Sequence, residues 1–239
     1  TGNCLYQERI LLYMNYDSVP LRDFKELNDW ETVIFVYQSA LKQVETKIDI
    51  LNGEFQHRHK YNPIEHVKSR IKTPESIVKK LKRHGYESSI ENMVRYVNDI
   101  AGIRISCSFT SDIYLIADMI SKQNDLTILA RRDYMKNPKK SGYRSYHMLV
   151  TTPVFLSDSI IDTKVEIQIR TVAQDFWATL EHKMHYKFEG DGPDYITKEL
   201  RECARYVAEL DTRMEELNNE IQKYGKLSDR ALEKLFLIE

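Results

Sequence analysis

The sequence has few of the features on which disulfide-rich, membrane-inserted or strongly charged proteins depend. Its three cysteines, Cys4, Cys107 and Cys203, are odd in number and far apart, and none forms a C-x-x-C pair. No run approaches the roughly 20 apolar residues that cross a bilayer, and no basic segment with an apolar stretch opens the chain. The net charge of −1 argues against a general nucleic-acid-binding surface. We therefore expect a folded protein of the reducing cytoplasm.

Familiar catalytic motifs are also missing. The sequence contains no Gly-rich phosphate loop of the Walker or dinucleotide kind, no His-Glu-x-x-His and no Gly-x-Ser-x-Gly. His182 and His185 lie three residues apart, but they have no third ligand or cysteine pair nearby. Such histidines more often serve packing or hydrogen bonding than metal binding, so no zinc site is predicted.

Two segments have the periodicity of long helices, one from about residue 22 to 56 and one near the C-terminal end. In both, apolar residues recur at steps of three and four and form a narrow seam. Two interpretations stay open: the seams pack on a sheet or on each other, or they join subunits. The first seam comprises Leu27, Trp30, Ile34, Tyr37, Leu41, Val44, Ile48, Leu51 and Phe55, and the second comprises Leu200, Cys203, Val207, Leu210, Met214, Leu217 and Ile221.

The middle of the chain has the pattern of an α+β domain. Apolar residues alternate with polar ones from Ile103 to Phe109, which indicates a half-buried strand. Thr73-Pro74-Glu75 predicts a helix start near residue 74, after a short helical piece that follows Asn62-Pro63. Further strands are predicted at about 126–134, 145–151 and 160–170, a helix at about 111–122, and loops at Asn137-Pro138 and Thr152-Pro153.

Two acidic residues are candidates for chemistry. Alternation from Val165 to Arg170 places Glu166 and Gln168 on one strand face, although a solvated polar face explains that pattern equally simply. Asp99 comes just before the strand of 101–109, where Gly102 permits a close backbone approach. If these strands are neighbours, Asp99 and Glu166 form a carboxylate pair that can hold Mg²⁺ together with substrate phosphates.

Two basic stretches suit a nucleotide. Residues 131–144 carry six Lys or Arg against one acid, interleaved with tyrosines whose rings can stack on a base. Ser76, Lys80 and Arg83 share one helix face behind Arg70 and Lys72, where a helix N-terminus can bind phosphate. A flexible basic loop and a solvated helix face are the simpler interpretations, and composition alone does not decide between them.

Four ordered motifs together resemble the synthetase domain of the RelA/SpoT family. They are Arg70-x-Lys72-x-x-x-Ser76-Ile77-x-x-Lys80, then Asp-Ile-Ala-Gly-Ile-Arg from Asp99, then Arg132-Asp-Tyr through Ser-Gly-Tyr-Arg-Ser-Tyr-His147, and Val-Glu-Ile-Gln-Ile-Arg-Thr around Glu166. The match spans about residues 63–188, and the lack of a hydrolase half resembles the small alarmone synthetases. The resemblance implies a mixed sheet of about five strands wrapped by helices, in a synthetase domain at 63–190. Helical regions at 1–62 and 191–239 would flank it.

The resemblance also implies a reaction, the transfer of pyrophosphate from ATP to the 3′ hydroxyl of GDP or GTP, with GMP as a third candidate acceptor. Asp99 and Glu166 would hold Mg²⁺, Glu166 would take the proton of the attacking hydroxyl, and Gln168 would support it. The remaining positions that match substrate-binding residues are Arg70, Lys72, Ser76, Lys80 and Arg83 for the ATP phosphates, Arg104 and Arg132 for adenine, Tyr143 for guanine, and Lys139 and His147 for the acceptor's phosphates.

Members of this family form homotetramers, and the two helical seams offer a means of assembly. In the subfamily that its own product activates, Phe and Thr usually stand where this chain has His66 and Lys68. Aromatic stacking at these positions is therefore lost. We predict weak or absent activation, which a marked rise in initial rate on adding pppGpp would contradict.

Three rival interpretations remain. A non-catalytic RNA-binding module would use the basic stretches but has no need for Asp99 and Glu166 in one cleft. A nucleotidyltransferase that moves NMP also needs metal-binding carboxylates, so only the transferred group separates it from a pyrophosphokinase. A helical scaffold with a degenerate domain is disfavoured by the intact spacing of all four motifs.

Overall fold

A computed structural model describes residues 29–59, 61–187 and 194–236, and its centre is one mixed five-stranded sheet. The strand order is β1-β2-β5-β4-β3, and only the β2–β5 pair is parallel among the ladders of the described chain. The predicted α+β fold with a mixed sheet is therefore confirmed. The strands are β1 (Ile64–Ile71), β2 (Ala101–Cys107), β3 (Thr127–Asp133), β4 (Tyr146–Phe155) and β5 (Ile160–Thr171).

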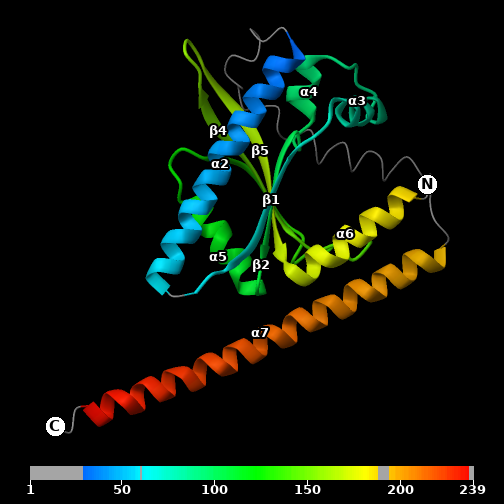
Figure 1. Cartoon of the computed structure of the whole chain (residues 1–239). Coiled ribbons are helices and arrows are strands. Elements are labelled where there is room, and N and C mark those ends of the chain that lie inside the picture. Colours follow the sequence, from blue (N-terminus) through cyan, green and yellow to red (C-terminus); the bar gives the residue numbers. More distant parts are fainter. Residues whose placement is uncertain (1–28, 60, 188–193, 237–239) are drawn as a thin grey trace.

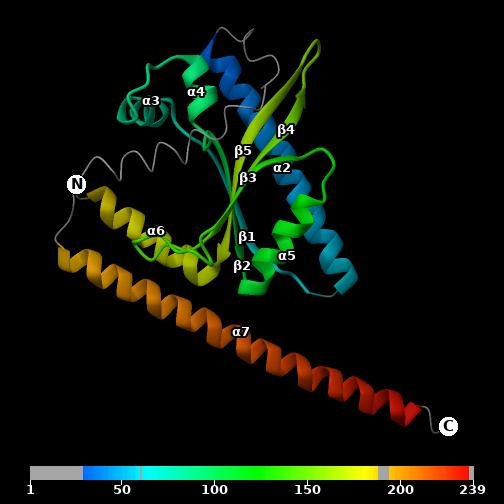
Figure 2. The same ribbon diagram turned by 180° about the vertical axis from the view of Figure 1, so that it is seen from behind.

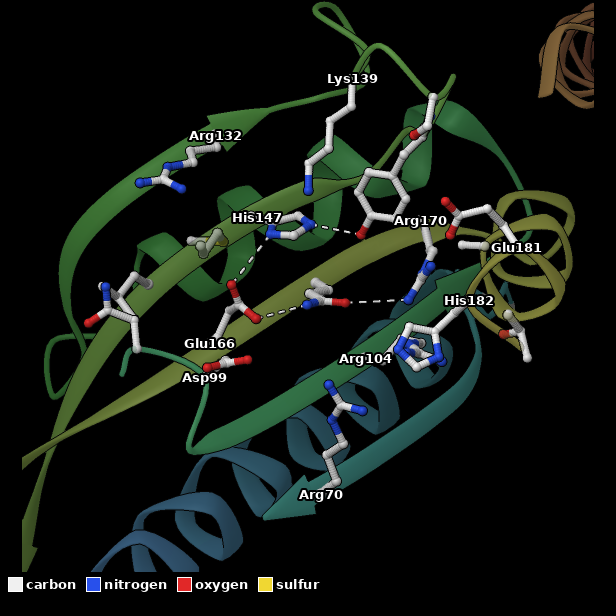
Figure 3. Close-up of a pocket in the computed structure, with 18 of the residues that line it drawn as sticks. Arg70, Asp99, Arg104, Arg132, Lys139, His147, Glu166, Arg170, Glu181 and His182 are labelled. Atoms are coloured by element: carbon white, nitrogen blue, oxygen red, sulfur yellow. Dashed lines mark hydrogen bonds and ion pairs between the residues drawn. The ribbon is translucent and has the colours of Figure 1, made fainter. Parts of the chain in front are cut away.

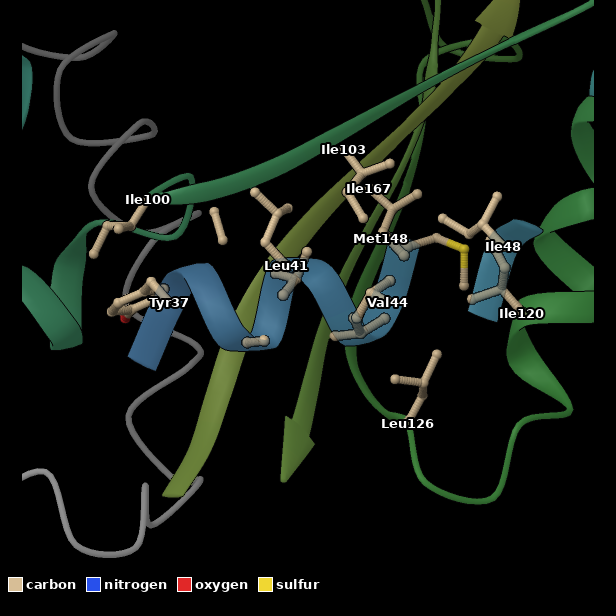
Figure 4. Close-up of a cluster of buried hydrophobic side chains, with 14 of the residues drawn as sticks. Tyr37, Leu41, Val44, Ile48, Ile100, Ile103, Ile120, Leu126, Met148 and Ile167 are labelled. Atoms are coloured by element: carbon tan, nitrogen blue, oxygen red, sulfur yellow. The ribbon is translucent and has the colours of Figure 1, made fainter. Parts of the chain in front are cut away.

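One face of the sheet is covered by α2 (Trp30–His59) and α5 (Thr110–Ser121), which lie on the same side in Figure 1. The seam of α2 packs on the strands: Tyr37, Val44 and Ile48 are almost fully buried. Figure 4 shows these side chains against Ile103, Met148 and Ile167 of the sheet. For this seam, packing on the sheet is the interpretation that holds, and the part of the predicted helix before residue 29 lies outside the described residues.

The segment after Asn62-Pro63 is a strand, so the prediction of a short helical piece is wrong. Its apolar residues Ile64, Val67 and Ile71 are spaced three and four apart, as in a helix. This spacing is tolerated because β1 is an edge strand. Only Ile64 is buried, and the ladder is irregular between Ile64 and His66. Edge strands bury less and therefore lose the period-two signal on which strand prediction depends.

The predicted loop at Thr152-Pro153 is also wrong, because Pro153 lies within β4 opposite Asp162 of β5. The β3–β4 ladder reaches only to Thr151, so beyond it one edge of β4 has no strand partner among the residues that the structure describes. Proline, which has no N–H to donate, is accepted at such an edge. The structure also contains a helix that was not predicted, α4 (Ile90–Tyr96), which Ser89 caps through its side chain.

On the opposite side of the sheet lie α3 (Pro74–Arg83) and α6 (Val172–Lys187), as the two views in Figures 1 and 2 show. We call this the open face, because residues of the sheet line a cavity there. Thr73 caps α3, so the predicted helix start is confirmed. On the open face, alternation presents polar residues from every strand, among them Arg70, Arg104, Arg132, His147 and Glu166. The site is therefore built on the rigid sheet and closed by helices.

The last element, α7 (Asp194–Phe236), runs beside α6 and then extends away from the sheet (Figure 1). Its first half is fastened to the domain, because Asp211 accepts hydrogen bonds from Thr171 Oγ1 and Gln174 Nε2 at 2.8 and 2.7 Å. The seam beyond it, from Leu210 through Met214 and Leu217 to Ile221, is about half exposed or more. Among the described helices, none combines the length and apolarity of a membrane span.

Candidate active site

The open face of the sheet holds a cavity of about 540 Å³ (Figure 3). Strands β2 and β5 run parallel with Gly102 opposite Glu166 and Arg104 opposite Gln168. Because Gly102 has no side chain, the space above it stays open beside Glu166. Ten of the thirteen site residues predicted from the sequence line this cavity: Arg70, Lys80, Asp99, Arg104, Arg132, Lys139, Tyr143, His147, Glu166 and Gln168.

Asp99 lies on the turn that precedes β2 and is held by two lysines. Lys72 Nζ is 2.8 Å from its Oδ2 and Lys80 Nζ is 2.7 Å from its Oδ1. Burial pushes the pKa of Asp99 upward, but the charges of Lys80 and Lys72 outweigh burial and hold this pKa at about 2. The carboxylate is thus ionised at neutral pH.

Glu166 is the acceptor at the end of two chains of hydrogen-bond donors (Figure 3). On one side Tyr143 Oη lies 2.9 Å from His147 Nε2, and His147 Nδ1 lies 3.5 Å from Glu166 Oε1. On the other side Gln168 Nε2 donates to Glu166 Oε2 at 2.8 Å. Arg170 Nη2 donates to Gln168 Oε1 at 3.3 Å, and since guanidinium only donates, this contact fixes which way the Gln168 amide points.

The protonation states in these chains follow from burial and hydrogen bonding. Burial lowers the pKa of His147 despite the neighbouring Glu166, so the imidazole is neutral near pH 7. The network then assigns its one proton to Nδ1, facing Glu166, while Nε2 accepts from Tyr143. Burial pushes the pKa of Glu166 upward, but the hydrogen bonds from His147 and Gln168 outweigh burial and hold this pKa below its ordinary value. Glu166 is therefore an ionised carboxylate that faces the cavity.

Two arginines from the parallel strands share one acid, Asp175, in the first turn of α6. Arg104 Nη1 lies 3.4 Å and Arg170 Nε 3.3 Å from Asp175 Oδ1. These are ion pairs and not hydrogen bonds, because within the described part of the chain Arg170 Nε and Asp175 Oδ1 are buried without a hydrogen-bond partner. An acid near a helix N-terminus is also favoured by the helix dipole. Asp175 thereby ties α6 to both strands beneath the cavity.

The basic loop between β3 and β4 brings Lys139 and Tyr143 to the cavity. Lys139 Nζ lies 4.7 Å from the centroid of the Tyr143 ring and 4.8 Å from that of Tyr134. Gly142, with φ of 91°, allows the turn that aims the loop inward, and a Cβ there would lie 2.5 Å from Ala204 of α7. A cation held between aromatic faces is therefore available at this end of the site.

Three predicted residues do not line the cavity. Lys72 reaches it only through Asp99. Ser76 is used locally, since its backbone N–H donates to Thr73 Oγ1 at 3.3 Å and its hydroxyl lies 3.0 Å from the same oxygen. Arg83, in the last turn of α3, is also outside the lining.

The cavity also contains residues that were not predicted as site residues, from the turn before β2, from the loop between β3 and β4, from β5 and from α6. His182, for which packing or hydrogen bonding was expected, lies at the cavity and is exposed. Arg170 carried a signal, since it shares its strand face with Glu166 and Gln168, and Ser141 stands within the third family motif. The unpredicted polar or charged lining residues are Asn98, Ser141, Arg170, Thr179, Glu181, His182 and Lys183.

The chemistry of the donor set fits a magnesium ion bound jointly with substrate. Within the described residues no group of three or more His, Cys, Asp or Glu side chains is arranged to hold a metal by itself. Asp99 and Glu166 nevertheless line the same cavity, amid cationic side chains that suit phosphate. Mg²⁺ is commonly held by one or two carboxylates together with substrate phosphates, which matches such a pair.

An ionised carboxylate pair ringed by cationic and aromatic side chains defines a site for phosphate-bearing nucleotides. The family described as "Region found in RelA / SpoT proteins" matches residues 69–191. The chain is 45% identical over 195 residues to the GTP pyrophosphokinase YwaC of Bacillus subtilis, covering 82% of this chain and 93% of that protein. The chain belongs to the RelA/SpoT family, as its motifs indicated.

Solved structures agree with the sequence comparison. Small alarmone synthetase 2 of Bacillus subtilis aligns with a TM-score of 0.73 and 44% identity over 80% of this chain and 99% of that one. Small alarmone synthetase 1 of the same organism, bound to its product pppGpp, aligns with a TM-score of 0.75 and 34% identity over 81% and 98%. The same synthetase has also been solved with AMPCPP.

The ion pairs of Asp99 make a prediction about stability. Because its pKa lies below the ordinary 3.8, ionised Asp99 stabilises the fold above about pH 4, and that contribution is lost as the pH falls toward 2. The loss amounts to about 2 kcal/mol. The difference in free energy of unfolding between the wild type and Asp99→Asn, measured with urea, should therefore shrink by this amount as the pH falls from 5 to 2. Asp49→Asn, at an exposed acid, is the control, and a gap between Asp99→Asn and wild type that does not change with pH would contradict the prediction.

Proposed function

We propose that this chain is a (p)ppGpp synthetase that transfers pyrophosphate from ATP to the 3′ hydroxyl of GDP or GTP, with GMP as a further possible acceptor. The observation that carries the proposal is the position of Glu166. It is an ionised carboxylate fixed by donors on both sides, in the same cavity as Asp99. The names of the relatives, a GTP pyrophosphokinase and two small alarmone synthetases, support the same reaction.

The donor end of the cavity lies near β1, the turn before β2, and α3. Arg70 and Lys80 line it, and Lys72 lies beside them on Asp99. When triphosphate enters, Lys72 and Lys80 can exchange the Asp99 carboxylate for phosphate oxygens, which leaves Asp99 available to a magnesium ion bound with the phosphates. Arg104 and Arg132 offer guanidinium planes for adenine. Ser76 and Arg83 of α3 stay proposed contacts of the phosphates, although neither lines the cavity.

The acceptor end lies at the loop between β3 and β4. Tyr143 supplies a ring for stacking on guanine, and Lys139 supplies charge for the acceptor's phosphates. His147 is already bonded to Tyr143 and to Glu166, so it connects base recognition with the orientation of the catalytic carboxylate. A contact between His147 and the acceptor's phosphates would have to replace one of these bonds.

In this mechanism Glu166 takes the proton of the 3′ hydroxyl, and Gln168 keeps Glu166 oriented. Magnesium, held by Asp99 and Glu166 with the phosphates of ATP, would neutralise charge on the transferred group. The cationic side chains align the two nucleotides, and positioning of this kind accounts for much of the catalysis in phosphoryl transfer.

Replacing Glu166 tests the proposal directly. Glu166→Gln keeps the shape of the side chain but removes the base, so turnover with ATP and GDP should fall about 10²- to 10⁴-fold. Binding of AMPCPP without magnesium should persist. The control is Glu65→Gln, at an acid of β1 that pairs with Ser108 outside the cavity, and its turnover should be unchanged. A loss of less than about tenfold in Glu166→Gln would contradict a base at this position.

We also propose that the chain is a cytoplasmic homotetramer, with a synthetase domain at 63–190 between helical regions at 1–62 and 191–239. The exposed seam of α7 supports assembly, because Leu217 and Ile221 are 52% and 66% exposed although a helical apolar stripe ordinarily has a partner. RNA is not proposed as a partner, since an RNA module needs no ionised pair in its binding cleft.

The seam predicts the effect of a charge on assembly. Leu217→Glu combined with Ile221→Glu should lower the particle mass in light scattering below that of the wild type, because charge cannot be buried in an apolar interface. The chain mass is 28.3 kDa, so the species are easily resolved. Glu220→Gln, at an exposed polar position between them, is the matched control. If the double variant keeps the particle mass of a wild-type tetramer, the interface lies elsewhere.

A further inference from the structure

A buried lysine, Lys164, lies on the catalytic strand and has no part in the mechanism described above. It precedes Glu166 by two residues on β5, so both side chains point to the same face of the sheet, about 7 Å apart along the strand. Lys164 is only 5% exposed and does not line the cavity. A charge this deeply buried is costly unless it is fully bonded, so its partners identify its task.

The ammonium group of Lys164 fastens the end of α4 to β5. Nζ donates to the carbonyl oxygens of Val94 and Arg95, both at 3.1 Å, and to Asn98 Oδ1 at 3.0 Å. Val94 and Arg95 belong to the last turn of α4, where carbonyl groups have no partner within the helix. A cation at this end is also favoured by the helix dipole.

The third partner, Asn98, is the residue immediately before Asp99. The β2–β5 ladder begins only at Gly102 opposite Glu166, so Asp99 lies outside the ladder on a turn. On the β1 side the turn is fixed by the backbone bond from Lys72 N to Ile100 O at 2.8 Å. On the β5 side Lys164 supplies the corresponding restraint through Asn98.

Lys164 differs in this respect from the two lysines that contact Asp99 directly. Lys72 and Lys80 neutralise the carboxylate, and the proposed mechanism has them exchange it for phosphate. Once they do so, their hold on Asp99 is lost. Lys164 itself does not line the cavity, and it bonds to two backbone carbonyls of α4 and to the side chain of Asn98, so it can keep the turn in place throughout.

We infer that Lys164 is a positioning residue that sets the spacing between Asp99 and Glu166 and thereby makes this pair competent to bind magnesium with ATP. The inference rests on the proposed function. It assigns Lys164 no contact with substrate. Removing a group that orients a metal ligand typically weakens metal affinity 10- to 100-fold, which gives the scale of the expected effect.

The test is the energetic coupling between Mg²⁺ and an ATP analogue. Calorimetry gives the affinity of the full chain for AMPCPP with Mg²⁺ and with EDTA, and the ratio of the two measures the coupling. In Lys164→Met we expect this ratio to fall about tenfold, with little change in the magnesium-free affinity. A purely structural lysine would lower the melting temperature and leave the ratio at its wild-type value, which would overturn the inference.

Matched variants separate positioning from stability. Val165→Ala removes a fully buried side chain from the opposite face of the same strand, so it should lower the melting temperature without changing the ratio. Asn98→Ala removes the link next to Asp99, and it should lower the ratio by less than Lys164→Met. If Lys164→Met does not fold, Lys164→Gln keeps an amide donor that is too short to reach all three oxygens, and a wild-type ratio there would also overturn the inference.

The same preparations distinguish failure of the inference from failure of the proposed function. Wild type that makes a 3′ pyrophosphorylated guanosine product, together with an unchanged ratio in Lys164→Met, leaves the function intact and removes the role of Lys164. Wild type with no such product removes the proposed function itself.

Discussion

The parallel pairing of β2 with β5 is the constraint on which the site depends. It joins two segments more than sixty residues apart in the sequence and sets Gly102 against Glu166. Because β2 begins opposite the middle of β5, the turn before β2, which carries Asp99, lies beside Glu166. A shift of one residue in this register would turn Glu166 and Gln168 into the core, because strand side chains alternate between faces. The core seam of α2 against Ile167 and Ile169 prevents such a shift.

The two faces of β5 carry opposite chemistry. Toward α2, Val165, Ile167 and Ile169 are buried among apolar side chains. On the other face Lys164, Glu166, Gln168 and Arg170 form a row in which each side chain bonds to a neighbour or to another element. Buried polar groups confer precise geometry only when their partners are present, because an unpaired one is costly. The row therefore makes one strand both a core element and the support of the site.

The sequence predicted those parts of the molecule that local pattern determines. Alternation placed Glu166 and Gln168 on one face, Thr73-Pro74 located α3, and the seams located the long helices. The edge strand β1 and the proline within β4 were missed, because an edge position relaxes both burial and hydrogen-bond demands. The sequence predicted that Asp99 and Glu166 converge only if their strands are neighbours, because no local pattern shows which strands pair.

The site residues that were missed depend on long-range contacts. Asp175 was overlooked because its role as the shared partner of Arg104 and Arg170 exists only once β2, β5 and α6 meet. Lys164 has the same strand parity as Glu166, which was a usable signal, yet its partners on α4 come from about 70 residues away. Family motifs supplied the reaction, and the fold supplied the reason that these residues meet.

The fate of a labelled phosphate tests the central claim most directly. The chain would be incubated with Mg²⁺, GDP and ATP labelled at the γ position, and the guanosine products separated. Transfer of the β,γ pyrophosphate predicts that the guanosine product carries the label in the outer phosphate of its 3′ pyrophosphate, with AMP as the other product. Label released as inorganic pyrophosphate, with AMP joined to the acceptor, would contradict the account and identify a nucleotidyltransferase.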